Sequence, residues 1–162
     1  MTPYSNIDLL LTLHPHGWSL AHISINAELL EYDISHIFND PYSDTIDALL
    51  SLIKGNESFF YWFSEPFGIK VELKKADSNE LIIFMIYDIN KEFYEEIEDK
   101  DLIFIKSFEV NLKQLLVLFY YQFKKTCVLL ENKEYAMDRS KDFPFQKFRQ
   151  FETVIKKYCE IN

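Results

Sequence analysis

The sequence predicts an α+β fold, in which a mostly antiparallel sheet of about six strands, in the order β-β-α-β-β-β-β-α-α, has helices packed on it. Short segments with alternating apolar residues predict the strands, and turn residues separate one strand from the next. Longer segments with apolar residues at every third or fourth position predict the helices. Strands joined by short turns pair in antiparallel fashion. Because no linker or repeat divides the chain, we expect a single domain over residues 1–162.

The first two strands are expected to form an N-terminal hairpin. Every second residue from Ile7 to Leu13 is Ile or Leu, which is the pattern of a strand with one buried face. Residues 14–17 (His-Pro-His-Gly) suit a turn, because proline restricts φ and glycine tolerates positive φ. A second strand is expected from Trp18 to about Leu30.

Four more strands are expected between the first and second helices, at residues 57–64, 69–74, 81–86 and 101–110. The first of them holds five consecutive aromatic residues, 59–63, so its rings point to both faces of the sheet. One of these faces is either covered within the chain or exposed as an interface. The segment 81–86 is apolar on both faces, which predicts a central strand.

Three segments carry helix signals. The first has an N-cap residue at Asp40, proline at the next position and Gly55 just past its end, which are the preferred residues at those places. A long second helix is expected after Asn111, and its nearly all-apolar surface predicts burial. A last helix opens near Asp142.

The net charge of −9 is unevenly distributed along the chain. Residues 1–120 hold 20 acidic and 8 basic side chains, whereas residues 121–162 hold 6 acidic and 9 basic ones. An acidic body repels the phosphates of nucleic acids, so we do not expect a nucleic-acid partner. It favours a basic protein partner through complementary fields.

No recognised catalytic or metal-binding motif is present, so we expect neither an enzyme nor a bound cofactor. Three scattered glycines cannot form a phosphate-binding loop, and Gly-x-Ser-x-Gly, His-Glu-x-x-His and Cys-x-x-Cys are all missing. His14, His16 and His22 could form a metal cluster if the hairpin brought them together. The favoured interpretation is that they are turn and strand residues without a metal.

We expect a cytoplasmic protein that does not enter a membrane. No apolar run reaches the length of a membrane-spanning helix, and the N-terminus lacks the basic and apolar regions of a signal peptide. Without export, Cys127 and Cys159 are expected to be reduced thiols.

The most distinctive polar segment is residues 91–101, here called the acidic segment. It holds six acidic residues and two lysines, interleaved with aromatic and aliphatic side chains. Acidic groups around aromatic anchors favour binding of a basic partner, because charge accelerates the encounter and a buried ring supplies affinity. A solvated connection without such a role is the alternative. The predicted partner-binding residues are Glu92, Phe93, Tyr94, Glu95, Glu96, Glu98, Asp99 and Asp101.

Residues 18–66 resemble immunity proteins of bacterial polymorphic toxin systems. The resemblance consists of a strand that starts at Trp18, a helix of spaced leucines opened by residues 39–41 (Asn-Asp-Pro), and an aromatic strand that ends in Glu65-Pro66. It implies a cytoplasmic protein without enzymatic activity that binds and neutralises a cognate toxin. Immunity families share no binding motif, so no residue role follows from the resemblance.

Two other functions remain open from the sequence. A pocket between the sheet and the helices, lined by Trp62, Tyr87 and Tyr120, could bind a small molecule or support catalysis. Alternatively, the aromatic strand at 59–63 could join copies of the chain into a structural homo-oligomer.

Overall fold

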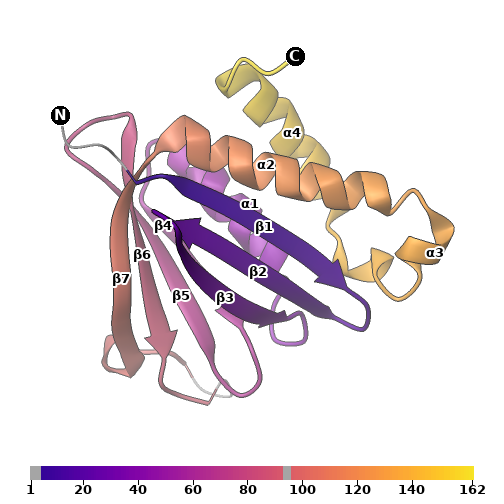
Figure 1. Ribbon diagram of the computed structural model, residues 1–162, viewed down its shortest axis with the longest axis horizontal. Helices are drawn as coiled ribbons and strands as arrows, with labels where there is room; N and C mark the ends of the chain where they lie inside the picture. Colours follow the sequence, from indigo (N-terminus) through magenta and orange to yellow (C-terminus); the bar gives the residue numbers. More distant parts are fainter. Residues whose placement is uncertain (1–4, 93–95) are drawn as a thin grey trace.

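The computed structural model describes residues 5–92 and 96–162 and confirms the α+β class (Figure 1). Its helices and strands alternate in blocks along the chain, as the sequence predicts. Two short 3-10 turns, Asp99–Asp101 and Ser140–Asp142, complete the described structure. In chain order the elements are β1 (Ile7–His14), β2 (Trp18–Ile25), β3 (Glu28–Ser35), α1 (Pro41–Ile53), β4 (Ser58–Phe63), β5 (Gly68–Lys75), β6 (Leu81–Ile89), β7 (Leu102–Asn111), α2 (Leu112–Leu129), α3 (Lys133–Ala136) and α4 (Phe145–Tyr158).

The described strands number seven and form two antiparallel sheets, which corrects the expectation of about six strands in one sheet. Sheet A has the order β1-β2-β3 and sheet B the order β4-β5-β6-β7. The strand expected over 18–30 is in fact two strands, because Asn26 and Ala27 turn the chain with φ of 49° and 71°. Two positive φ values suit a tight hairpin turn. Alanine rarely adopts this conformation, so the sequence carries no clear signal for the turn.

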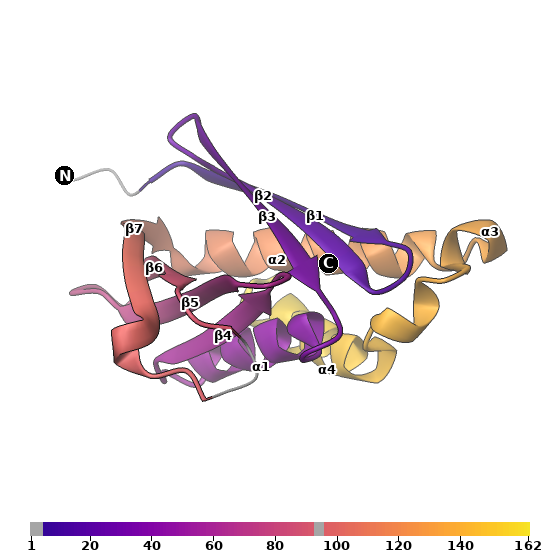
Figure 2. The same ribbon diagram turned by 90° about the horizontal axis from the view of Figure 1, so that it is seen from below.

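The two sheets and the helices enclose one continuous core. Side chains from the inner face of each sheet pack with α1, α2 and α4. Figure 1 shows α2 lying along β1, and Figure 2 shows sheet A lying over sheet B and α1. Side chains of α2 also bind the edge of β1: Gln122 accepts a hydrogen bond from the Leu11 amide, and Lys125 donates one to the Leu11 carbonyl. The position of α2 between β1 and α4 buries one side of the helix, but Tyr121, Val128 and Leu129 are 50%, 50% and 40% exposed, so the burial expected for α2 is only partly found.

The ends of α1 are those predicted from the sequence. Asp40 accepts a hydrogen bond of 3.0 Å from the Ser43 amide, and Pro41 begins the helix. Gly55 follows the helix with φ of 86°, which is the conformation that favours glycine after a helix. The contact of α1 with β4 includes two other hydrogen bonds, from the Ser58 hydroxyl to the Ala48 carbonyl and from the Trp62 indole to Thr45.

Replacing Asp40 with alanine should lower the free energy of unfolding by about 1 kcal/mol, because the Ser43 amide loses its acceptor. Urea denaturation followed by circular dichroism measures this change. Asp40→Asn keeps an acceptor at the N-cap and should stay within a few tenths of a kcal/mol of wild type. Equal losses in the two variants would contradict a capping role for Asp40.

A buried polar network joins sheet A to α1. The Ser19 hydroxyl lies 2.7 Å from Nε2 of His36 and 2.8 Å from the Tyr42 hydroxyl, and Ser19 and Tyr42 are buried. Burial lowers the pKa of His36, and the carboxylates of Asp142 and Asp40 offset only part of this effect. His36 is therefore held in its neutral form inside the fold.

Acidification should consequently remove stability through His36. Its folded-state pKa lies below the unfolded one, so its contribution is complete above about pH 6.5 and is lost as the pH falls through the lowered value. Urea denaturation of wild type and His36→Gln at several pH values measures this effect. The difference in unfolding free energy between the two proteins should shift in favour of the variant below pH ~6.5. A difference that does not change with pH would contradict the prediction.

Candidate functional site

A cleft of about 380 Å³ lies where β3 faces one end of sheet B. At this end β4 and β6 finish and β5 and β7 begin, because sheet B is an antiparallel meander. The antiparallel register aligns Ile69 of β5, Asp88 of β6 and Ile103 of β7 across the sheet. We call this feature the acidic cleft, and its lining residues are Glu31, Tyr32, Asp33, Trp62, Ser64, Phe67, Gly68, Ile69, Asp88, Ile89, Asn90 and Ile103.

Glu31, Asp33 and Asp88 are the acidic residues among those that line the acidic cleft, which include neither lysine nor arginine. Glu31 is 2.8 Å from Nε2 of His22. Asp33 and Asp88 are exposed, and within residues 5–92 and 96–162 neither carboxylate has a hydrogen-bond or ion-pair partner. The cleft therefore presents negative charge that the described part of the fold does not neutralise.

Aromatic and aliphatic side chains form the wall behind these carboxylates. Trp62 is 1% exposed, and its indole N–H donates a 3.0 Å hydrogen bond to Thr45 of α1. Burial, with further contributions from Asp88 and Glu28, raises the pKa of Tyr32 to about 12, so its hydroxyl remains a donor at neutral pH. Phe67 is 47% exposed at the rim. The cleft thus combines a fixed apolar wall with an exposed ring.

Gly68 keeps the β4–β5 turn close to this wall. A Cβ atom at this position would lie 2.6 Å from the Trp62 carbonyl oxygen and 2.7 Å from the Phe63 Cα. Real Cβ atoms do not approach backbone atoms so closely, so a side chain here would displace β4. The sequence marks this position only as a turn glycine.

The acidic segment begins directly after Asn90, so it continues the rim of the acidic cleft. The Asn90 amide donates to the Asp101 carbonyl at 2.7 Å, which closes the connection between β6 and β7. Among the residues predicted for partner binding, the side chains of Glu92, Glu96, Glu98 and Asp99 are exposed. Phe93, Tyr94 and Glu95 lie outside the described residues.

Asp101 differs from the other predicted residues because it holds the acidic segment together. Its carboxylate accepts a 2.8 Å hydrogen bond from the Glu98 amide and lies 3.3 Å from the Lys91 ammonium. These groups lower the pKa of Asp101. Lys91 also donates to the Glu96 carbonyl at 2.7 Å. We therefore assign Asp101 a structural role, and the exposed acids remain candidates for contact with a partner.

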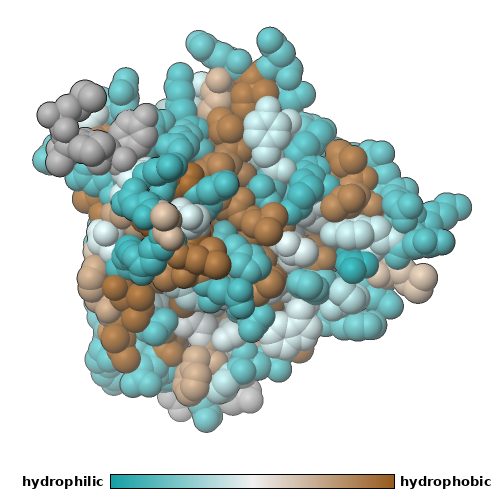
Figure 3. Space-filling view, viewed as in Figure 1, coloured by the Kyte–Doolittle hydropathy of each residue, from teal (hydrophilic) through white to brown (hydrophobic). Residues whose placement is uncertain are grey.

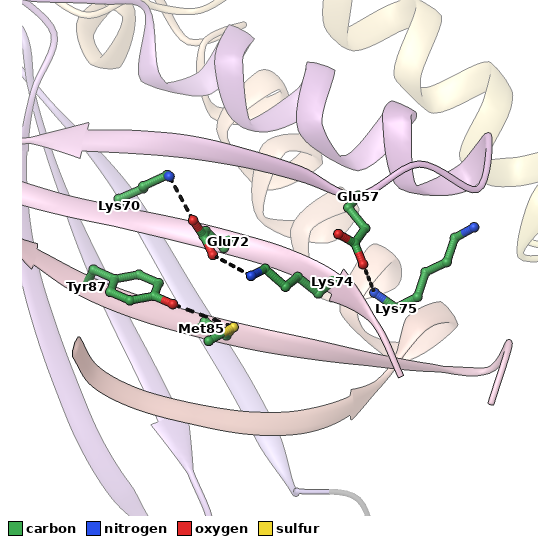
Figure 4. Close-up of polar contacts among 7 residues, drawn as sticks. All are labelled: Glu57, Lys70, Glu72, Lys74, Lys75, Met85 and Tyr87. Carbon is green, nitrogen blue, oxygen red and sulfur yellow. Dashed lines mark hydrogen bonds and ion pairs between the residues drawn. The ribbon is translucent and has the colours of Figure 1, made fainter. Parts of the chain in front are cut away.

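The outer face of sheet B is a second exposed surface, shown in Figure 4. Along β5, Glu72 lies 2.7 Å from Lys70 and 3.2 Å from Lys74. Burial alone would raise the pKa of Glu72, but the two ammonium groups outweigh burial and lower it. Lys70 also lies 4.7 Å from the centre of the Phe59 ring. Because these charges satisfy one another, this face has less free charge than the acidic cleft.

The aromatic strand is covered on one face only. Phe60 and Trp62 are buried in the core, whereas Phe59 is 53% exposed and Tyr61 and Phe63 are half-buried on the outer face. Phe59, Tyr61 and Phe63 contact one another in sequence along the strand, with ring centres 5.5 Å and 5.3 Å apart. The rings thus shield one another in part.

The other sequence-based candidates are not brought together. Strand register pairs His14 with Trp18 and His22 with Leu10, so the hairpin separates the histidines. Within residues 5–92 and 96–162, no group of three His, Cys, Asp or Glu side chains suits a metal ion.

The three residues expected to line a pocket between the sheet and the helices lie in different places. Trp62 is in the core, Tyr87 lies on the outer face of sheet B (Figure 4), and Tyr120 of α2 donates to Glu152 at 2.7 Å. These three residues therefore do not line a common pocket.

The cysteines are free and half-buried, and burial raises the pKa of both thiols. A raised pKa disfavours the reactive thiolate at neutral pH.

In the part of the chain that the structure describes, no helix is both long and apolar enough to cross a membrane. Comparisons with protein-family models, with curated proteins and with solved structures found no match to this chain.

The residues that sequence reasoning missed are Glu31, Asp33 and Asp88. Asp88 is the single acidic residue of the apolar strand β6, whereas Glu31 and Asp33 are two of the three acidic residues of β3 and alternate there with apolar ones. Their proximity depends on sheet A lying against one end of sheet B. The turn at 26–27, which the sequence does not signal, places Glu31 and Asp33 on β3 and so creates one wall of the acidic cleft.

Proposed function

We propose that this protein is a non-enzymatic inhibitor that binds a basic protein partner through the acidic cleft and the neighbouring acidic segment. The observation that carries this proposal is that two acidic residues without a hydrogen-bond or ion-pair partner in the described structure, Asp33 and Asp88, line a cleft with an aromatic wall. Such a site suits a lysine or arginine side chain, since the carboxylates attract its charge and the rings pack against its apolar stem.

The partner class follows from the same charges. A cytoplasmic toxin that acts on nucleic acid carries a basic active surface, because it must bind phosphates. An acidic protein that covers this surface blocks access to the substrate, and long-range attraction accelerates the encounter. The function implied by the resemblance to immunity proteins, neutralisation of a cognate bacterial toxin in the cytoplasm, agrees with this arrangement.

The acidic segment provides a direct test of the electrostatic contribution. Replacing its exposed acids in the variant Glu92→Gln/Glu96→Gln/Asp99→Asn should weaken partner binding about 10-fold and reduce the salt dependence of affinity, because charges at a rim act mainly through screened attraction. Surface plasmon resonance at 50 and 300 mM salt against the captured partner measures both effects. The variant keeps Asp101, so the local fold is preserved.

A control variant removes two charges, one fewer than the acidic-segment variant, at the opposite end of sheet B. Asp77 and Glu80 are exposed in the β5–β6 connection, and Asp77→Asn/Glu80→Gln should leave affinity within about 2-fold of wild type, because those charges lie beyond the screening length from the cleft. If this control weakens binding as much as the acidic-segment variant does, net charge alone matters and the proposed surface is wrong.

A further inference from the structure

The outer edge of β3 runs along the acidic cleft. β3 pairs with β2 on one side, and the His36 amide donates to the Gly17 carbonyl at 2.8 Å just beyond that pairing. Because hydrogen-bonded positions recur at every second residue of an antiparallel pair, the even-numbered residues of β3 bond to β2. The backbone N–H and C=O groups of Glu31 and Asp33 therefore point away from β2, toward the other edge.

The acidic cleft gives this edge open space. The side chains of Glu31 and Asp33 are exposed on the outer face of sheet A, whereas Tyr32 packs against the core, yet all three residues line the cleft. A cleft that borders the edge of a strand meets residues of both faces in this way. Within residues 5–92 and 96–162, no group bonds to the backbone of Glu31 or Asp33 on this side. Such unpaired backbone groups are a template for another strand.

The surroundings of the edge differ between the two faces that an added strand would have. Figure 3 views the molecule from the side of sheet A, where hydrophilic and apolar side chains are mixed over β2 and β3. Glu31 and Asp33 supply acidic groups on this outer side. Toward sheet B the cleft is more apolar, because Phe67 and Ile103 are 47% and 50% exposed there. Asp88, which pairs with Ile103 in the sheet, adds negative charge on the far side.

We propose that the acidic cleft receives an extended segment of the basic partner, which adds to sheet A as a strand antiparallel to β3. This binding mode rests on the proposed inhibitor function and specifies which part of the partner is recognised. Residues opposite Glu31 and Asp33 exchange backbone hydrogen bonds with them, and their side chains share the outer face. Charge complementarity favours lysine or arginine at these positions. The positions between them face Phe67 and Ile103 and take apolar side chains.

The hexapeptide acetyl-Arg-Val-Arg-Val-Arg-Val-amide is a probe with this alternation, and NMR titration of the protein measures its binding. The amide signals of Glu31 and Asp33 should shift. Two methylated forms of the peptide have the same composition and charge. Methyl groups on the arginine amides occupy the edge that faces β3 and should weaken binding about 10-fold or more, because the hydrogen bonds are lost. Methyl groups on the valine amides lie on the far edge and should leave affinity within about 2-fold of the unmodified peptide.

The peptide pair distinguishes strand addition from simple attraction of charge. Equal affinities of the two methylated forms would overturn the proposal, because the peptide backbone would then have no part in binding. Weaker binding of the valine-methylated form alone would contradict the antiparallel arrangement. An unmodified peptide that does not shift the signals of Glu31 and Asp33 would also overturn the proposal.

Hydrogen exchange in the complex with the captured partner separates strand addition from the inhibitor proposal. The amides of Glu31 and Asp33 should exchange about 10-fold more slowly in the complex than in the free protein, while the amide of Asp77 in the β5–β6 connection keeps its rate. A partner that binds without slowing the two β3 amides would contradict strand addition and leave the inhibitor proposal standing. If no partner is captured, the inhibitor proposal fails, and the peptide titration still decides whether the edge accepts a strand.

Discussion

Replacing Trp62 with alanine is expected to lower the free energy of unfolding by about 3–5 kcal/mol, the range for truncating a large buried aromatic side chain. Trp62 is 1% exposed and packs against Phe60 and Phe119, with ring centres 5.1 Å and 6.4 Å away. The change also leaves the Thr45 hydroxyl without its indole donor. Because domains of this size are stable by only about 5–15 kcal/mol, the variant should be close to unfolding at 37 °C.

Urea denaturation followed by circular dichroism measures this loss, and the chain offers a matched control. Trp18 is the other tryptophan and is only partly buried at the start of β2. Trp18→Ala should therefore destabilise the protein by less than half as much as Trp62→Ala. Equal destabilisation by the two substitutions would show that Trp62 does not anchor β4 to α1 as the structure indicates.

Replacing the two acidic residues of the acidic cleft that lack a partner, Asp33 and Asp88, is expected to weaken partner binding by about 30- to 4,000-fold. A close charge pair that is desolvated in an interface contributes roughly 2–5 kcal/mol when one partner is truncated, and Asp33→Asn/Asp88→Asn leaves a partner cation without its counter-charge. The fold should not suffer, because neither carboxylate has a hydrogen bond or ion pair in the described structure. The unfolding free energy should thus stay within about 0.5 kcal/mol of wild type.

Calorimetric titration with the captured partner measures the loss of affinity, and the control Asp77→Asn/Glu80→Gln removes the same number of charges, two, elsewhere. The loss should persist at 300 mM salt, because a desolvated pair is screened less than an exposed one. Affinity that returns to the wild-type value at high salt would place these carboxylates outside the contact surface.

Local signals in the sequence predicted α1, α2 and α4, but not the short helix α3. At α1, the N-cap Asp40 and the terminal Gly55 lie where the capping rules place them, and Asn111 opens α2 by accepting from the Gln114 amide. The apolar alternation from Ile7 to Leu13 likewise corresponds to the buried face of β1. These features depend on residues close in the sequence, which is why single-sequence reasoning could predict them.

What the sequence did not predict depends on contacts between distant residues. The extra strand arises because Asn26 and Ala27 adopt positive φ without a glycine. The division into two sheets depends on how sheet A packs against sheet B, and the acidic cleft exists only once that packing has occurred. Asp33 and Asp88 are 55 residues apart in the chain, so no local pattern joins them. The acidic segment, by contrast, can be recognised in the sequence because its charges are contiguous.

The most direct test of the inhibitor proposal is capture of a partner from lysate of the native host. Tagged wild type, Asp33→Asn/Asp88→Asn and Asp77→Asn/Glu80→Gln would each be washed at low and high salt and analysed by mass spectrometry. The proposal predicts one basic protein, retained by wild type and by the Asp77/Glu80 variant, weakened by salt, and lost from the cleft variant. If cells shown to express their toxins yield no such protein, or if the cleft variant retains it fully, binding through the acidic cleft is contradicted.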